Sequence, residues 1–332
     1  MKVAVFDTHK FERPVFEKFN GDFRYDITYF ESRLTLETAA LADGFKVVCS
    51  FVNDRLSKEV LARLKERGVE LIALRSAGFN HVDIAEAKKL GIRVVRVPAY
   101  SPHAVGEHAV CLMLALNRKI HRAYGRVKEH NFSLDGLVGF DFNGKTVGVV
   151  GTGKIGGVVA MIMHGFGCKI LAYDVVPNEH LQQKAGAEYV SLEELFQRSD
   201  VISLHVPLTP ETRHLVDERS LSLTKEGVMI INTGRGALID TSALISALKS
   251  GQVGSAGLDV YEEEENVFFQ DLSEVVLQDD VLARLLTFPN VLITSHQGFL
   301  TKEALENIVL TTFRNIKAYQ NGLPLENQVK AG

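Results

Sequence analysis

Residues 146–174 read TVGVVGTGKIGGVVAMIMHGFGCKILAYD. An apolar strand at residues 147–150 leads into a glycine turn and then into a helix of small and apolar residues. A second apolar strand follows the helix and ends on Asp174. Strand, glycine turn, helix and strand in this order are typical of one half of a dinucleotide-binding α/β fold.

The three glycines of the turn have different expected roles. Gly151 permits the tight turn after the strand, Gly153 lets the backbone approach a pyrophosphate, and Gly156 lets the helix pack closely on the sheet. The helix begins at Lys154 and Ile155, where free N–H groups and the positive end of the helix dipole attract phosphate. The turn therefore predicts a phosphate site at the N-terminus of this helix.

Asp174 lies where the ribose of a bound dinucleotide would lie, about 20 residues after the glycine turn. Its carboxylate can accept both ribose hydroxyls, whereas a 2′-phosphate would meet like charge. Val175, Val176 and Pro177 offer no arginine to receive such a phosphate. We therefore predict NAD rather than NADP. An ordinary glycine-rich turn is the alternative, and the strand, helix and aspartate at the required places argue against it.

The composition limits the classes of protein to which the chain can belong. A length of 332 residues predicts two domains. Its hydrophobic content of 46% and charged content of 23% are those of a soluble globular protein. The net charge of −4 and a pI near 6.3 favour a small-molecule ligand over nucleic acid or a membrane. The first residues, MKVAVFD, alternate like a strand and lack signal-peptide features, which predicts a cytoplasmic protein.

Cysteines and histidines give no sign of a disulfide or a metal site. Cys49, Cys111 and Cys168 lie far apart among apolar neighbours, so we expect reduced core residues in a reducing compartment. His103 and His108 lie five residues apart on one predicted helix and do not share a face well. We expect no metal.

Short apolar strands alternate with helical segments in the first hundred residues. The expected strands are residues 3–6, 25–29, 47–50, 71–74 and 94–97, and the expected helices are residues 57–67 and 82–90. This alternation predicts a parallel sheet with helices on both faces.

A long helix is expected to begin at Ser101 and Pro102, a residue pair that suits a helix N-terminus. Its apolar face would consist of Val105, Ala109, Leu112, Leu116 and Ile120, with Arg118, Lys119 and Arg122 near its end. Such a helix can pack against a second subunit or within its own chain, and the sequence leaves both open.

The remainder of the chain predicts a second doubly wound domain. Its expected strands are residues 201–204, 228–231, 255–258 and 291–294, with helices at residues 192–198 and 241–249. A final amphipathic helix at residues 302–319 is free to return to the first domain. We predict a substrate domain at residues 1–100 plus 300–332, a dinucleotide domain at residues 101–299, and a ligand cleft between them.

Four strands of the second domain end in polar or charged residues, and such ends share one edge of a parallel sheet. Arg235 lies between Gly234 and Gly236 and can present a planar fork of donors to a carboxylate. A surface ion pair is the alternative for this arginine. His296 can pass a proton to a carbonyl near neutral pH, with a structural histidine as the alternative.

A carboxylate beside His296 would keep that imidazole protonated. The acidic run at residues 262–265 offers four candidates, and spacing alone does not choose among them. A solvated acidic loop is the alternative for the whole run.

The chain resembles the D-2-hydroxyacid dehydrogenases over nearly its whole length, and among them the bacterial fermentative enzymes that form D-lactate. The motifs that carry the resemblance are FVND at 51–54, RSAGFN at 75–80, VPAYSP at 97–102, GTGKIG at 151–156, NTGRGALID at 232–240, DVYEEE at 259–264 and HQGF at 296–299. The resemblance implies two doubly wound parallel-sheet domains, with a Rossmann-type NAD domain inserted into a flavodoxin-like substrate domain.

The family's motifs also imply roles for single residues. Arg235 matches the substrate-binding arginine, His296 the proton donor, and Glu264 the partner of that histidine. The other implied substrate-binding residues are Ala77 and Gly78 through their amides, Tyr100 through its hydroxyl, and Phe51 and Phe299 as apolar limits of the pocket. The other implied cofactor-binding residues are His205, Val206, Pro207, Thr212, Thr233, Gly234 and, at the nicotinamide end, Asp259. Ser295 and Gly298 depart from the proline and alanine common in the family, in the loop that carries His296 and Phe299.

The resemblance implies reversible reduction of pyruvate to D-lactate by NADH, in a homodimer or an assembly of dimers. A dehydrogenase for a larger acid, such as 2-hydroxyisocaproate, is the alternative among enzymes, although Phe51, Tyr100 and Phe299 suggest a small pocket. An NAD-sensing scaffold is the alternative from another class.

Overall fold

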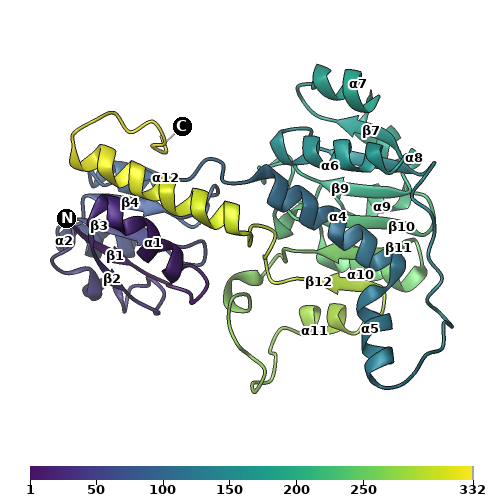
Figure 1. The fold of residues 1–332 in the computed structure, drawn as a ribbon, viewed down its shortest axis with the longest axis horizontal. Coiled ribbons are helices and arrows are strands. Elements are labelled where there is room, and N and C mark those ends of the chain that lie inside the picture. The colour runs from purple at the N-terminus through teal and green to yellow at the C-terminus, as the bar shows by residue number, and fades with distance from the viewer. Residues whose placement is uncertain (331–332) are drawn as a thin grey trace. The chain divides into compact units, whose positions relative to one another are not determined.

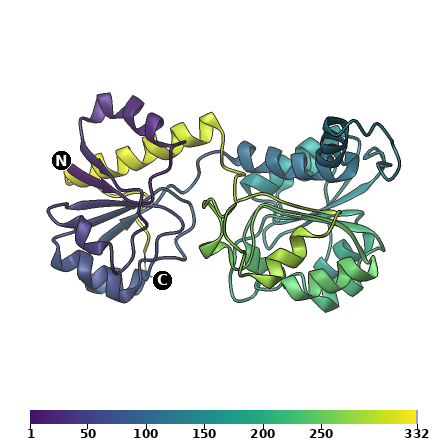
Figure 2. The ribbon, with the colours of Figure 1, turned by 90° about the horizontal axis from the view of Figure 1, so that it is seen from below.

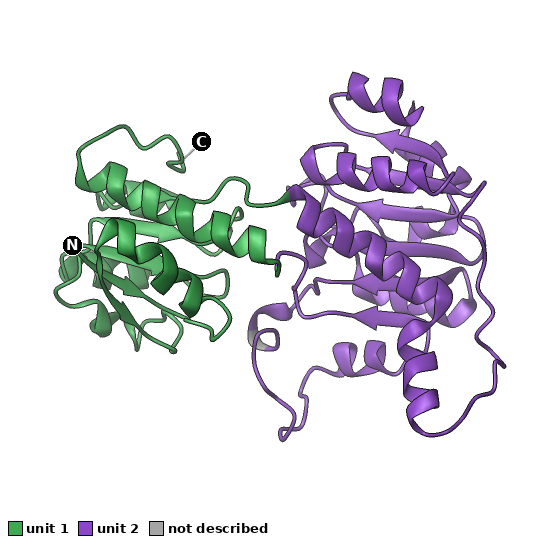
Figure 3. Cartoon of the chain, viewed as in Figure 1, with its two compact units in different colours: residues 1–101, 300–332 green, residues 102–299 purple. Residues whose placement is uncertain are grey.

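The chain folds into two compact units, which Figure 3 colours separately. The computed structural model describes residues 1–330. Unit 1 comprises Met1–Ser101 and the residues from Leu300 onward, and unit 2 comprises Pro102–Phe299. In each unit, helices lie on both faces of a parallel sheet (Figure 2). The predicted α/β class is confirmed.

Unit 1 contains a five-stranded sheet in the order β2-β1-β3-β4-β5, with every pair parallel. Its strands are β1 (Lys2–Val5), β2 (Asp26–Tyr29), β3 (Val47–Ser50), β4 (Leu71–Leu74) and β5 (Arg93–Val95). Its α-helices are α1 (Arg13–Phe23), α2 (Lys58–Glu66), α3 (Ile84–Lys89) and α12 (Lys302–Gln320). This strand order is that of flavodoxin-like folds.

Helix α12 completes the core of unit 1 from the far end of the sequence (Figure 1). Phe313 of this helix is buried, and its ring centre lies 5.5 Å from that of Phe16 and 5.4 Å from that of Tyr25. Both contacts are edge-on, an arrangement that aromatic rings favour. The last helix is therefore part of the first folding unit.

Unit 2 contains a seven-stranded parallel sheet in the order β12-β11-β10-β9-β6-β7-β8. Its strands are β6 (Thr146–Val150), β7 (Lys169–Tyr173), β8 (Glu188–Tyr189), β9 (Val201–Leu204), β10 (Val228–Asn232), β11 (Val253–Leu258) and β12 (Val291–Ile293). Its α-helices are α4 (Pro102–Arg118), α5 (Ile120–Lys128), α6 (Lys154–Gly165), α7 (Glu179–Ala185), α8 (Leu192–Arg198), α9 (Glu218–Ser222), α10 (Thr241–Ser250) and α11 (Asp280–Leu286). The order reverses direction at β6, as in a Rossmann fold.

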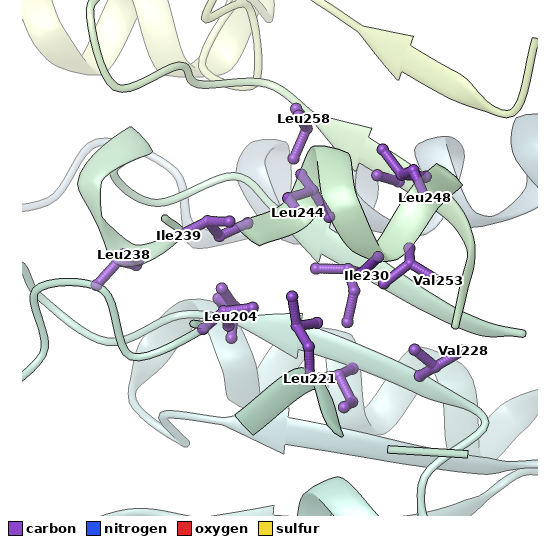
Figure 4. Packing of buried hydrophobic residues seen from close by; sticks show 14 of the residues in the cluster. Leu204, Leu221, Val228, Ile230, Leu238, Ile239, Leu244, Leu248, Val253 and Leu258 are labelled. Carbon is purple, nitrogen blue, oxygen red and sulfur yellow. The ribbon is translucent and has the colours of Figure 1, made fainter. Parts of the chain in front are cut away.

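Successive residues of the central strands of unit 2 are buried on opposite faces of the sheet. Ile230 of β10 belongs to the same cluster as Leu221 of α9 and Leu244 of α10 (Figure 4). Its neighbours Met229 and Ile231 belong to the cluster on the face that α4 and α6 cover. Burial on both faces explains why these strands read as unbroken apolar runs.

The predicted long helix is wrong beyond Arg118. Lys119 has a left-handed backbone with φ +50°, which ends α4, and α5 begins at the next residue. The Lys119 ammonium donates to the carbonyl of Val138, 2.6 Å away. Ile120 is consequently 60% exposed instead of continuing the buried face of α4.

Cys111 also differs from the prediction, because it is exposed, whereas Cys49 and Cys168 are buried. It occupies the outer face of α4, between the buried residues Val110 and Leu112. Apolar neighbours in the sequence therefore do not bury a helical residue that points the other way. Within residues 1–330, every helix is too short or too polar to cross a membrane.

Candidate active site

The glycine turn between β6 and α6 has two positions that exclude a side chain. Gly151 has φ +93°, and a Cβ on it would lie 2.7 Å from the carbonyl carbon of His205. A Cβ on Gly156 would lie 1.9 Å from the carbonyl oxygen of Gly151. At Gly153, by contrast, no described atom outside its chain neighbours lies within 4 Å of the Cβ position. The turn is thus closed toward the sheet and open beside Gly153, at the N-terminus of α6, whose first residues are Lys154 and Ile155.

Asp174 follows β7, and the turn itself holds its carboxylate. Its Oδ2 atom accepts the N–H of Thr152 at 2.6 Å and the hydroxyl of Thr152 at 3.1 Å. The Thr152 hydroxyl in turn accepts from Tyr189, 2.8 Å away. Thr152 was missed in the sequence, although its place between two turn glycines marks it as the residue beside the aspartate. Asp174 is therefore fixed next to the predicted phosphate site.

Thr233, directly after β10, has a buried hydroxyl for which the described residues supply no hydrogen-bond partner. A buried polar atom of this kind is normally satisfied by a partner or a ligand. Its neighbour Gly234 donates its N–H to the side-chain oxygen of Asn232, which fixes the backbone of the loop. Thr233 therefore offers a hydrogen bond at the carboxyl edge of the sheet.

The segment after β9 lies against the glycine turn. A Cβ on Gly151 would come within 2.9 Å of the Val206 side chain. The Nε2 atom of His205 lies 2.8 Å from the Ser203 hydroxyl, and desolvation lowers the pKa of His205 to about 4, which keeps it neutral at pH 7. The Thr212 hydroxyl donates to the carbonyl of Pro207 at 2.6 Å and closes the loop.

These features fit a dinucleotide. The amides at the start of α6, next to Gly153, would hold the pyrophosphate, and Asp174 would accept the ribose hydroxyls. The unpartnered hydroxyl of Thr233 would lie further along the same edge of the sheet.

Arg235 is half-buried in the loop after β10. Its carbonyl accepts from the side-chain amide of Asn232 at 2.9 Å, and its Nη1 donates to the carbonyl of Gly234 at 2.7 Å. A Cβ on Gly236 would lie 2.1 Å from the carbonyl of Tyr261, so glycine is required there. No acidic side chain among residues 1–330 pairs with Arg235, which leaves its charge for an anionic ligand.

His296 and Glu264 form a close pair. The Nδ1 atom of His296 lies 2.8 Å from Oε1 of Glu264, and the side chains are 16% and 19% exposed. The other carboxylate oxygen of Glu264 accepts the N–H of Tyr261 at 3.0 Å. With Nδ1 engaged, Nε2 is the ring atom that can exchange a proton with a ligand. The Phe269 ring lies 6.0 Å from the His296 ring and 6.5 Å from the Phe299 ring.

Two glutamates of the acidic run are part-buried and form ion pairs. Glu262 accepts from His214 at 2.7 Å and from Arg213 at 3.0 Å. Glu264 pairs with His296, whereas Glu263 and Glu265 are exposed. A solvated acidic loop therefore does not describe Glu262 and Glu264, which both have partners in the fold.

Asp259 has a buried carboxylate that faces the turn at residues 296–298. Its two oxygens accept the N–H groups of Gln297 and Gly298, both at 2.8 Å. The hydroxyl of Thr294 donates to it at 2.6 Å, and Nε2 of His108 lies 3.2 Å away. The sequence indicated neither Thr294 nor His108 here, because the contacts join residues up to 186 positions apart.

In unit 1, the predicted substrate-binding residues lie on loops that follow the strands. The carbonyl of Ala77 accepts from Arg96 at 2.8 Å, and that of Gly78 accepts from the Ser76 hydroxyl at 2.7 Å. The amides of Ala77 and Gly78 have no acceptor in the described part of the chain. Tyr100 is half-buried, and its carbonyl accepts from the Asn307 side chain at 2.7 Å.

Phe51 is buried, and both its backbone and its ring are held. Its N–H donates to the Asp54 carboxylate at 2.7 Å, and the Arg75 guanidinium lies 5.0 Å from its ring centre. The His9 ring meets it edge-on at 5.2 Å. Phe51 therefore has a fixed position in unit 1.

A family model described as D-isomer specific 2-hydroxyacid dehydrogenase, NAD binding domain, matches residues 110–298. The chain belongs to this family. The predicted family, fold class and NAD cofactor are thereby confirmed.

Several members of the family are similar to the chain over its full length. D-lactate dehydrogenase of Escherichia coli is 51% identical over 99% of this chain and 100% of its own. Its apo structure superposes with a TM-score of 0.92, at 49% identity, over 99% of this chain and 100% of that one. The pyruvate reductase of Chlamydomonas reinhardtii gives a TM-score of 0.92 at 46% identity over 98% of each chain. A D-2-hydroxyisocaproate dehydrogenase gives 0.87 at 31% identity over the whole of both chains.

The two departures from the family's motif each have a local contact in this dehydrogenase. The Ser295 hydroxyl accepts the N–H of Phe269 at 3.3 Å, a contact that proline could not make. A Cβ on Gly298 would lie 2.9 Å from Oδ2 of Asp259, closer than unstrained packing allows. The Ser295 and Gly298 positions therefore fit the loop that carries His296.

Proposed function

We propose that this dehydrogenase catalyses the reversible reduction of pyruvate to D-lactate, with His296 as the proton donor. The observation that carries the proposal is the His296–Glu264 pair, which lies in the same unit as an arginine with no acidic partner among the described residues. An acid, its orienting carboxylate and a carboxylate-binding cation are the groups that reduction of a 2-oxoacid requires.

The substrate carboxylate is bound by Arg235, whose planar fork matches two carboxylate oxygens. The amides of Ala77 and Gly78 supply further donors, since they have no acceptor in the described part of the chain. NADH, when bound, supplies the hydride to C2 of the substrate. Arg235 also stabilises the negative charge that develops on the substrate oxygen.

His296 carries the proton of the reaction on Nε2. In the reduction direction the imidazolium donates this proton to the carbonyl oxygen and becomes neutral. Throughout the reaction Glu264 accepts a hydrogen bond from the Nδ1–H group of His296. This bond orients the ring, and the carboxylate charge stabilises the imidazolium before the transfer. In the oxidation direction the neutral Nε2 removes the hydroxyl proton of D-lactate.

The size of the substrate side chain is set by Phe51, Phe299 and Tyr100. Phe51 is held by Asp54 and Arg75, and Phe299 lies beside Phe269, so neither ring is loosely placed. Fixed aromatic rings favour the methyl group of pyruvate over the branched chain of 2-ketoisocaproate. The full-length similarity to enzymes named for D-lactate and pyruvate supports the same choice.

The test is NADH oxidation with pyruvate, 2-ketoisocaproate, glyoxylate and hydroxypyruvate in parallel, followed by chiral analysis of the product. We expect pyruvate to give the highest kcat/KM and D-lactate to be the product. A preference for 2-ketoisocaproate would show that pyruvate is not the main substrate. L-lactate as the product would contradict the proposed stereochemistry. Tight NADH binding without turnover of any of the four would favour an NAD-sensing scaffold.

We further propose that the protein forms a homodimer or an assembly of dimers through α5 and the loop that follows it. Large apolar side chains that are 51% to 82% exposed gather there: Ile120, Tyr124, Val127, Phe132, Leu134 and Val138. Exposed apolar clusters of this kind mark interfaces. Sedimentation of Phe132→Ser/Leu134→Ser should show a smaller species than the parent, whereas the control Val276→Ser should not.

A cytoplasmic location is the proposal that fits the buried, unpaired thiols of Cys49 and Cys168. Fractionation of the source cells should recover the protein with cytosolic markers.

A further inference from the structure

The turn at residues 296–298, which carries the proposed proton donor, has a backbone that needs support. His296 has φ +49°, a left-handed conformation that residues with a Cβ rarely adopt. The N–H of His296 donates to the carbonyl of Asp259 at 2.7 Å, and the next two amides donate to the carboxylate of the same residue. Three successive amides of the turn thus bind Asp259.

The hydrogen bonds around Asp259 define where the protons lie. Thr294 donates its hydroxyl proton to Oδ1 of Asp259 at 2.6 Å. The Thr294 oxygen must then accept from Nε2 of His108, 3.0 Å away, so Nε2 of His108 carries a proton. The same N–H points toward Oδ1 of Asp259 at 3.2 Å. Burial disfavours the ionised carboxyl, but the His108 and Thr294 bonds outweigh it and hold the pKa of Asp259 below its ordinary value.

His108 reaches this carboxylate from a different layer of unit 2. It belongs to α4, which packs on β10 and β11, whereas Asp259 follows β11 and Thr294 follows β12. The imidazole also lies against the turn itself, because a Cβ on Gly298 would be 3.5 Å from its Cδ2 atom. His108 thereby links the α4 layer to the turn that carries His296.

We propose that His108 is a positioning residue for the proton donor. Its Nε2–H, acting through Thr294 and Asp259, holds the 296–298 turn in the conformation that aims His296 at the substrate. This inference rests on the proposed function of His296. In this role His108 does not contact the substrate. Its side chain therefore affects the rate of proton transfer, whereas Arg235 and the glycine turn bind the ligands.

The first experiment compares His108→Leu with His108→Gln. Leucine removes the N–H donor, whereas glutamine places an amide N–H near the position of Nε2. A misplacement of about 1 Å at the reacting group can cost on the order of 100-fold in rate. For His108→Leu we expect kcat for pyruvate reduction to fall by about 10- to 100-fold. We expect the pyruvate KM and the NADH dissociation constant to change little, and His108→Gln to recover most of the lost kcat.

His103 provides the matched control on the same helix. Its side chain is 74% exposed and pairs with Glu107, which takes no part in the hydrogen bonds around Asp259. His103→Leu should leave kcat and KM unchanged. If His108→Leu keeps the parent kcat, or if His108→Gln is as slow as His108→Leu, the positioning role is wrong.

Thr294 provides a second route if His108→Leu folds poorly. Thr294→Val removes the hydroxyl that joins His108 to Asp259, and Thr294→Ser retains it. We expect the valine variant to lose kcat and the serine variant to keep it. Equal kcat in the two variants would overturn the role of the link.

Amide hydrogen exchange of the cofactor-free protein gives a readout that does not depend on catalysis. The peptide containing Gln297 and Gly298 should exchange faster in His108→Leu than in the parent or in His103→Leu, because its amides lose a firmly held acceptor. An unchanged exchange rate contradicts the inference even if the proposed reaction is correct. Faster exchange in His108→Leu, found together with a parent protein that reduces no 2-oxoacid, would instead place the error in the proposed function.

Discussion

Nδ1 of His296 lies 2.8 Å from Oε1 of Glu264, and this contact joins the turn after β12 to the acidic run after β11. The negative charge of Glu264 favours the protonated imidazole. Reduction of a 2-oxoacid needs that protonated form, and oxidation of the product needs the neutral one. The two directions of the reaction therefore respond oppositely to the loss of this charge.

For Glu264→Gln we expect the high-pH limit of pyruvate reduction to move to lower pH, because the charge beside the imidazolium is removed. Without the carboxylate the imidazole releases its proton more readily, so oxidation of D-lactate should persist to lower pH than in the parent. Initial rates in both directions between pH 5 and 9 measure this. Glu262→Gln is the control, because Glu262 pairs with His214 and Arg213. Identical pH profiles for the parent and Glu264→Gln would show that Glu264 does not control the protonation of His296.

For Arg235→Lys we expect a steep rise in the pyruvate KM and a lower kcat, with kcat/KM reduced by about 100-fold, or roughly 3 kcal/mol. Lysine keeps the charge but loses the planar fork that matches a carboxylate. NADH affinity, measured by fluorescence, should not change. Arg213→Lys should behave like the parent, because this arginine is 57% exposed and pairs with Glu262. An Arg235→Lys enzyme with the parent kcat/KM would remove Arg235 from the substrate site.

For Gly156→Ala we expect a loss of stability. The new Cβ would meet the carbonyl oxygen of Gly151 at 1.9 Å, so the backbone of α6 or of the turn must move. Overpacking of this kind costs about 1–3 kcal/mol in the free energy of unfolding, which urea titration measures. Gly157→Ala is the control one residue later, since its Cβ would meet Leu181 at an ordinary 3.8 Å. Equal stability of the two variants would show that the turn is not tightly packed.

For Gly153→Ala we expect weaker NADH binding without a loss of stability. No described atom beyond its chain neighbours lies within 4 Å of the Cβ position, so the folded state should be as stable as the parent. The added methyl group lies where the backbone is expected to approach the pyrophosphate, so NADH should bind more weakly. Isothermal titration with NADH measures this affinity. An unchanged affinity would show that the pyrophosphate does not bind beside Gly153.

The lowered pKa of half-buried His205 predicts how acid affects unit 2. Desolvation lowers the pKa of His205 to about 4 in the folded protein, from an ordinary value of 6.5. The unfolded chain therefore takes up the proton first as the pH falls below 6.5, and this group removes stability between pH 6.5 and about 4. One proton limits the slope to about 1.4 kcal/mol per pH unit. His205→Gln should lose less stability than the parent between pH 6.5 and 4.5, and an equal loss would contradict this assignment.

The strands were predictable because their burial leaves a simple pattern. Residues 47–50, 71–74 and 201–204 were expected as strands and are strands with the same ends, because both of their faces are covered and every residue is apolar or small. Helices α7, α9 and α11 were not predicted. They have 7, 5 and 7 residues, but α8, which also has 7 residues and a polar cap, was predicted, so length alone does not explain why these three were missed. The break at Lys119 has no glycine or proline to mark it.

The candidate site also contains residues that the sequence suggested and residues that it did not. The glycine turn, Arg235 and His296 could be found because each is set off by its neighbours in the chain. Spacing alone could not choose among the four glutamates, since contacts between β11 and β12 distinguish them and these contacts depend on the folded register. Thr152, Thr294 and His108 act on other residues of the site, so the sequence around each gives little sign of a role.

The return of α12 to unit 1 has a consequence for the order in which the chain folds during its synthesis. Phe313 is part of the core beside Phe16 and Tyr25, yet about 200 residues of unit 2 are translated between them. At about 5–20 residues per second the ribosome needs roughly 10–40 s for that insertion. The inserted unit can fold while the N-terminal strands still lack their last helix, so the apolar surfaces of β4 and α1 that α12 covers stay exposed in the nascent chain. The first domain to emerge is thus the last to be completed, and it is the part of the protein that chaperones would be expected to protect.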